Sequence, residues 1–173
     1  MLGQMMHRPL SIIEILRFAA ETHSKSDIVS VRTEGDMHRY TYPDAYLRVC
    51  QLANAFEKLG VKAGDRIATL AWNGYRHFEL YYAISGVGAV CHTINPRLSA
   101  EQMIYITQHA SDSIMCVDLT FVPLVEALSE KFGLPLLAKI PISEDTNNKA
   151  DGGIPLINQE INSSTKLAIE QLV

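Results

Sequence analysis

Residues 59–96, LGVKAGDRIATLAWNGYRHFELYYAISGVGAVCHTINP, contain a strand, a helix and a second strand in succession. Residues 66–71 are short and apolar, which is typical of a strand buried on both faces of a parallel sheet. Residues 89–94 form the second strand, and Asn95-Pro96 ends it because proline has no N–H to give to a ladder. With the right-handed crossover that parallel strands favour, this stretch predicts one β-α-β unit.

The helix between these strands is marked by side chains at helical spacing, namely Phe78, Tyr81, Tyr82 and Ser85. We expect Asn73 to cap its first turn by accepting a hydrogen bond from a free backbone N–H. Gly86 and Gly88 end the helix. They do not make a dinucleotide fingerprint, because the third glycine is missing and the segment leads from a helix into a strand.

Three elements are predicted before this unit: a helix over residues 11–22, a hairpin of strands 28–33 and 37–42, and a helix that Gly60 ends. Ser11 and Glu14 have the spacing of a capping box and should start the first helix. Thr41 and Asp44 flank Pro43 as the start signal of the second helix. The hairpin lies outside the β-α-β pattern and should be antiparallel.

Four elements are predicted after it: a helix over residues 99–109, a strand over 114–117, a helix over 120–132 and a strand over 136–142. Ser99 and Gln102 form another capping box. Residues 143–153 are almost without apolar side chains and read as a linker, followed by a last helix that ends near Leu172. The fold class is therefore α/β, with a mostly parallel sheet, flanking helices and an antiparallel hairpin.

Composition excludes several classes of protein. The chain has 173 residues and a net charge of −4, and its 15 basic residues are scattered, so we expect no nucleic-acid partner. No apolar run reaches the ~20 residues of a transmembrane helix, and no signal peptide is visible, which favours the cytoplasm. Three widely spaced cysteines fit reduced, buried side chains better than disulfides or a metal site.

Three blocks in order carry a resemblance to a known family: a Tyr-Thr-Tyr segment at residues 40–42, GVKAGDR at 60–66 and GAVCHTINPRL at 88–98. They are similar to the N-terminal part of the AMP-forming acyl-CoA synthetases, in the adenylate-forming superfamily. LAWN at residues 70–73 and VDLTF at 117–121 look like the branch that acts on medium- or long-chain fatty acids. Residues 1–142 are then an incomplete N-terminal subdomain of this type, and 143–173 are a polar linker with a divergent tail.

The resemblance implies a two-step reaction: ATP and a fatty carboxylate give an acyl-adenylate and pyrophosphate, and coenzyme A then displaces AMP. ATP, magnesium and coenzyme A are thus expected cofactors of the complete enzyme, and none is expected to bind this chain alone. The family's phosphate loop, Thr-Ser-Gly-Thr-Thr-Gly-x-Pro-Lys, is absent from the sequence, as are matches to its magnesium ligand and catalytic lysine. We therefore assign no catalytic and no cofactor-binding residue, and we expect the chain alone to be inactive.

His92 is the one candidate substrate-binding residue, because it lies near the carboxyl end of a strand, where open α/β sheets place their ligands. The alternative is a histidine packed near the core with its ring nitrogens bonded to neighbours. None of the six histidines has a cysteine or carboxylate at metal-ligand spacing, so no metal site is expected.

Two hypotheses on function follow. In the first, the chain is the N-terminal fragment of an ATP-dependent medium- or long-chain fatty-acid–CoA ligase. In the second, it is a stand-alone, non-catalytic module that dimerises or docks on a partner such as a full-length ligase, which the divergent tail favours. A third possibility, a nucleotide-binding regulator, would need a phosphate-binding turn that the sequence lacks.

Overall fold

The computed structural model of the chain describes residues 10–128, 131 and 139–142. Its elements follow one another in this order: α1 (Ile13–Thr22), β1 (Asp27–Val31), β2 (Met37–Thr41), α2 (Tyr42–Lys58), β3 (Arg66–Leu70), α3 (Tyr75–Gly86), β4 (Val90–Thr93), α4 (Ala100–Ala110), β5 (Ile114–Asp118), the 3-10 turn η1 (Leu119–Phe121), α5 (Val122–Ala127) and β6 (Lys139–Ile142). The predicted β-α-β unit corresponds to β3, α3 and β4.

The strands of the described residues form two separate sheets. β1 and β2 pair antiparallel as a hairpin, with Asp27 opposite Thr41 and Val31 opposite Met37. The other four strands form a parallel sheet in the order β4-β3-β5-β6. The predicted α/β class, with a parallel sheet and an antiparallel hairpin, is confirmed.

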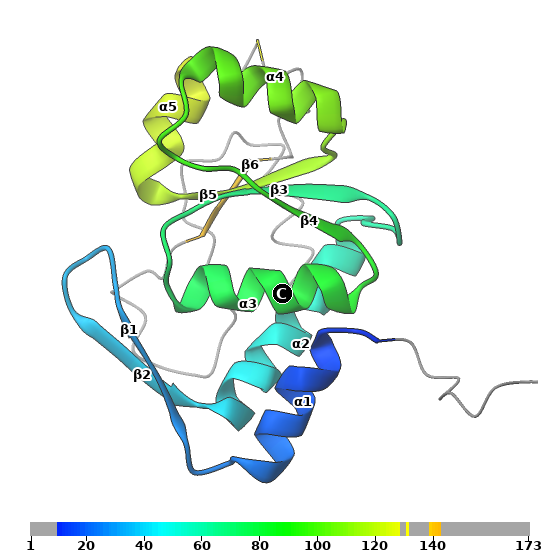
Figure 1. Ribbon diagram of the computed structural model, residues 1–173, viewed down its shortest axis with the longest axis vertical. Helices are drawn as coiled ribbons and strands as arrows, with labels where there is room; N and C mark the ends of the chain where they lie inside the picture. The colour runs from blue at the N-terminus through cyan, green and yellow to red at the C-terminus, as the bar shows by residue number, and fades with distance from the viewer. Residues whose placement is uncertain (1–9, 129–130, 132–138, 143–173) are drawn as a thin grey trace, which may run out of the picture.

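Helices cover the parallel sheet on both faces (Figure 1). α4 and α5 lie on one face, and α3 lies on the other with α2 and α1 beyond it. The chain leaves β3 in one direction to reach β4, then crosses back through α4 to β5 on the opposite side of β3. This reversal makes β3 and β5 the strands at the topological switch point, where open α/β sheets bind ligands.

Each face of the sheet has its own apolar core. Between the sheet and the inner helices, the core is built on Leu16, Val49, Phe56, Ile67, Leu80 and Ile84. Under α4 and α5 it is built on Leu70, Ile94, Met103, Met115, Val117 and Val125. β3 contributes Ile67 to one core and Leu70 to the other, as expected for a strand buried on both faces.

The helix starts confirm one predicted capping box and the predicted start signal of α2, and they correct the other predicted capping box. Thr41 with Asp44 caps α2, and Ser99 with Gln102 caps α4, both with the reciprocal hydrogen bonds of a capping box. The predicted capping box at Ser11 is wrong. α1 begins after Ile12 without a side-chain cap, because Glu14 turns away to bind Arg17 one turn later.

Toward the carboxyl end the structure describes only parts of the predicted elements. The 3-10 turn replaces the start of the expected helix over residues 120–132, so that α5 begins at Val122 with Pro123 in its first turn. The predicted strand over 136–142 is described only as β6, and the linker and last helix predicted within 143–173 lie outside the described residues. None of the helices in the described part has the length and apolar character that crossing a bilayer requires.

Candidate functional site

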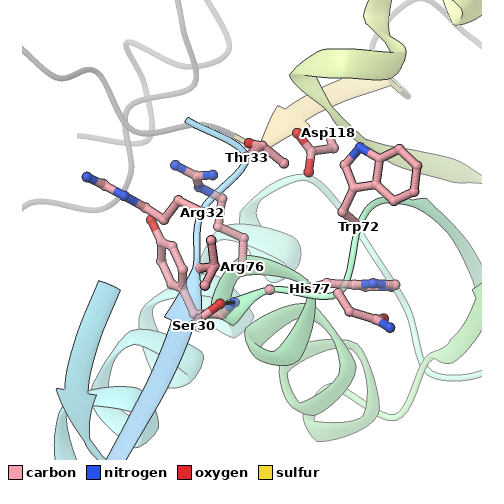
Figure 2. Close-up of a pocket in the computed structure, with 11 residues that line it drawn as sticks. Ser30, Arg32, Thr33, Trp72, Arg76, His77 and Asp118 are labelled. Carbon is pink, nitrogen blue, oxygen red and sulfur yellow. Dashed lines mark hydrogen bonds between the residues drawn. The ribbon is translucent and has the colours of Figure 1, made fainter. Parts of the chain in front are cut away.

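A pocket of about 110 Å³ opens at the switch point of the sheet (Figure 2). It is bounded by the hairpin at residues 30–33, by the β3–α3 loop with the first turn of α3, and by Asp118 at the carboxyl end of β5. We call it the switch pocket. Segments that are far apart in the sequence meet there because the strand order brings the ends of β3 and β5 side by side.

The first turn of α3 is held by the hairpin. Gly74 occupies the N-cap position in an extended conformation without a side-chain cap, and the N–H of Tyr75 donates to Ser30 Oγ at 3.1 Å. The predicted cap by Asn73 is therefore wrong. The hydroxyl of Ser30 on β1 accepts the hydrogen bond that Asn73 was expected to accept, so the position of α3 depends on the hairpin.

Two arginines approach the switch pocket, and each is paired with a carboxylate of the hairpin. Arg76 is nearly buried and its Nη2 lies 2.8 Å from Glu34 Oε1, while its guanidinium stands over the Tyr75 ring at 5.0 Å. Arg32 donates from Nε to Asp36 Oδ1 at 2.7 Å. Burial alone would raise the pKa of Glu34, but the hydrogen bond from Arg76 brings it below its ordinary value.

Asp118 and His77 are the buried titratable groups of the switch pocket. Burial raises the pKa of Asp118, although the charge of Arg76 and backbone hydrogen bonds at Trp72 and Thr120 oppose the rise. Burial lowers the pKa of His77, so its ring favours the neutral form. His77 Nε2 lies 2.9 Å from Thr69 Oγ1. Because Thr69 is fully buried inside the sheet, this hydroxyl–imidazole pair is closed to a substrate and is structural.

His92 lies on β4, an edge strand, outside the residues that line the switch pocket. Its Nδ1 is 2.7 Å from Oδ2 of Asp112, whose side chain is fully buried. Burial raises the pKa of that carboxyl, and the hydrogen bond and charge of His92 oppose the rise. This geometry agrees with the alternative, in which His92 packs near the core and its ring is hydrogen-bonded to a neighbour. A role for His92 in substrate binding stays a prediction.

The described residues bring no group of three or more His, Cys, Asp or Glu together in a way that would hold a metal ion. The switch pocket itself was not predicted from the sequence. Asp118 follows a predicted strand, so the rule applied to His92 could have found it. Ser30 and Arg76 gave no signal, because their roles depend on contacts between the hairpin and α3.

Comparison with known proteins decides the family. The model of the family described as "AMP-binding enzyme" matches residues 16–164. The chain belongs to this AMP-binding enzyme family. The match includes nearly all of the described α/β unit, and it confirms the resemblance to the N-terminal part of an AMP-forming acyl-CoA synthetase.

Relatives of this chain are acyl-CoA ligases. It is 48% identical to 3-methylmercaptopropionyl-CoA ligase of Ruegeria lacuscaerulensis over 76% of this chain and 24% of the relative. It is 41% identical to medium-chain-fatty-acid–CoA ligase of Ectopseudomonas oleovorans over 90% of this chain and 28% of the relative. The chain thus spans about a quarter of the length of these curated relatives.

A solved structure supports the fold. The N-terminal domain of FACL13 from Mycobacterium tuberculosis superposes with a TM-score of 0.62 at 22% identity, over 94% of this chain and 35% of that chain. This chain therefore has the fold of part of such an N-terminal domain.

The switch pocket does not fit the phosphates of ATP, the nucleotide that the family implies. Its two arginines are already neutralised by Glu34 and Asp36, and Asp118 adds a third carboxylate. A polyphosphate would have to compete with these carboxylates for both arginines. We therefore assign this pocket no step of nucleotide chemistry. The bonds at this pocket hold the hairpin to α3.

Proposed function

We propose that this chain forms the N-terminal α/β subdomain of an ATP-dependent medium- or long-chain fatty-acid–CoA ligase. The complete ligase would convert a carboxylic acid and ATP into an acyl-adenylate and pyrophosphate, and would then transfer the acyl group to coenzyme A. The observation that carries the proposal is the family match over residues 16–164, together with relatives that are acyl-CoA ligases.

The acid substrate is the least defined part of this proposal. One relative is named for a methylmercaptopropionyl group and another for medium-chain fatty acids. The same fold segment thus accompanies different acids, so we place acid selection in parts of the ligase that this chain does not supply. ATP, magnesium and coenzyme A are proposed for the complete ligase, in the cytoplasm.

Alone, the chain should not catalyse adenylation. The sequence lacks the phosphate loop that orients pyrophosphate in the family, and the described residues bring together no group of His, Cys, Asp or Glu that would hold a magnesium ion beside it. Fatty-acid-dependent ATP–pyrophosphate exchange by the purified chain tests this point. We expect no exchange above the blank, with the medium-chain relative of Ectopseudomonas oleovorans as the positive control. Exchange by the chain itself would overturn its inactivity.

The contribution to a ligase is tested by complementation. The medium-chain relative is expressed without the segment that matches this chain, and the purified chain is added to it. Restored pyrophosphate exchange supports the proposal, because the two chains then supply one fold between them. A mixture that is inactive although the two chains bind each other would contradict a direct substitution for that segment.

The alternative is a stand-alone, non-catalytic module that pairs with another copy of itself or with a full-length ligase. Large exposed apolar side chains on the outer surfaces of the described helices and hairpin favour it, among them Ile15, Phe18, Val31, Met37 and Tyr105. Light scattering of the purified chain tests self-association, and a clean monomer that binds no ligase would count against this alternative.

A further inference from the structure

An apolar hollow lies on α4 where no other described helix or strand contributes to its lining. α4 lies at the edge of the molecule, and no described element covers its outer side (Figure 1). The hollow has a volume of about 400 Å³ and is lined by Leu98, Glu101, Gln102, Tyr105 and Ile106. We call this surface, together with His109, the α4 outer face.

Part of this face already serves the fold, because Gln102 completes the capping box of α4 and Leu98 and Ile106 pack against the core, whereas Glu101, Tyr105 and His109 are exposed beside them. Met103 and Thr107 are buried on the opposite side of the helix and anchor it to the sheet. Tyr105 is nevertheless 65% exposed, and its ring stacks on His109 with 5.6 Å between centroids. A large aromatic side chain displayed beside an apolar hollow is the arrangement of an association surface.

The positions along the helix are self-complementary. Glu101, Tyr105 and His109 are four residues apart, so they follow one another along one side of α4 at about 6 Å per step. In a symmetric antiparallel pair with its axis at Tyr105, Glu101 of each copy meets His109 of the other copy. A twofold axis requires that kind of reciprocity.

We propose that the α4 outer face binds the same face of a second copy of this chain. In this pair each Tyr105 ring enters the hollow of the other copy, and Glu101 bonds to the second copy's His109 at both ends. Arg97, exposed just before the cap of α4, then lies near the carboxyl end of the other helix, where a cation is favoured. Antiparallel helix dipoles add to this complementarity.

This inference deepens the self-association of the alternative function and rests on it, not on the ligase role. Different results would therefore exclude this interface and exclude self-association. If the chain stays monomeric, self-association is excluded altogether. If it forms a dimer whose affinity does not change on substitution in α4, only this interface is excluded. One helix face is a small contact area, so a weak, concentration-dependent dimer is expected.

A charge exchange tests the pairing of Glu101 with His109 in the full chain. Dissociation constants are measured by analytical ultracentrifugation. Glu101→Lys removes both favourable pairs, and His109→Glu places two carboxylates against each other, so each should weaken the dimer by about tenfold or more. The double variant Glu101→Lys/His109→Glu restores opposite charges across the axis and should restore the dimer. Single and double variants with equal affinity would overturn the proposal.

The aromatic contact is tested with a matched pair of substitutions. Tyr105→Ser should abolish the dimer, while Phe18→Ser, at a similarly exposed aromatic position on α1, should leave it intact. In addition, Tyr105→Cys should give a disulfide-linked dimer on mild oxidation, because the two side chains meet at the axis. Loss of the dimer with Phe18→Ser but not with Tyr105→Ser would move the interface to α1 and overturn the proposal.

Discussion

The two faces of the parallel sheet are packed by different means. Under α4 and α5 the core is apolar, and Met103 and Met115 fill it without polar partners. Between the sheet and the hairpin, α3 buries charge as well: Glu79 is 3% exposed and accepts from Arg48 Nε at 2.7 Å. Burial and the nearby charge of Glu79 raise the pKa of Tyr40 in the hairpin.

On the α3 side, the pair of Arg48 with Glu79 joins α2 to α3, and buried charges of this kind are satisfied only in one arrangement of the helices. The α4 side needs only close packing, which many apolar side chains can provide. Polar contacts therefore determine how the elements on the α3 side are arranged, and packing of apolar side chains stabilises the α4 side.

Removing one charge from the α3 side should have the largest effect. Glu79→Ala leaves Arg48 buried without its carboxylate, and we expect the free energy of unfolding to fall by about 4 kcal/mol in urea titrations. The control is Asp27→Ala, which breaks the exposed pair with Arg39 and should cost less than about 1 kcal/mol. Equal losses in the two variants would mean that the α3 side is not held by its buried charges.

A cavity on the α4 side should have the next largest effect. Met103→Ala removes a side chain that is 1% exposed, and we expect a loss of about 3 kcal/mol in the free energy of unfolding. Tyr105→Ala on the same helix is the control, because its side chain faces outward. If the two substitutions cost the same, α4 is not anchored by its inner side, and the contrast between the faces disappears.

The smallest effect is a dependence on pH. His77 is buried and its pKa is lowered, so the unfolded chain binds a proton more readily than the folded chain. Stability should therefore be lost as the pH falls below the ordinary value of 6.5. His77→Gln retains a partner for Thr69 but cannot titrate, so this loss should be smaller in unfolding curves measured across that range.

The control for this pH dependence is His23→Gln, at an exposed position on the end of α1. It should lose stability with falling pH as the unchanged chain does. If His77→Gln shows the same loss as the control, titration on the α3 side does not contribute to stability.

Local signals in the sequence predicted the elements well. Two helix starts were correct because each capping box is completed within four residues, at Thr41 with Asp44 and at Ser99 with Gln102. The cap of α3 was not predictable, because Ser30 reaches Tyr75 from a strand that precedes it by more than forty positions. Local chemistry fixes where elements begin only when no distant side chain competes.

The candidate site was harder to predict than the fold. The rule that ligands bind at the carboxyl ends of strands points to one place only when the order of strands in the sheet is known. Alternating strands and helices do not reveal that order, and His92 was chosen on β4, which lies at an edge. The switch pocket instead lies where β3 and β5 end, beside Trp72 and Asp118.

The central position of β3 also has a consequence for synthesis on the ribosome. β4 follows β3 closely and can pair with it early, but the other neighbour, β5, begins 44 positions after Leu70 (114 − 70). At roughly 5–20 residues per second, one edge of β3 stays open for a few seconds while the chain emerges. During that interval an apolar strand with an unpaired edge can join another nascent chain, so slow translation between β4 and β5 should lower the yield of folded protein.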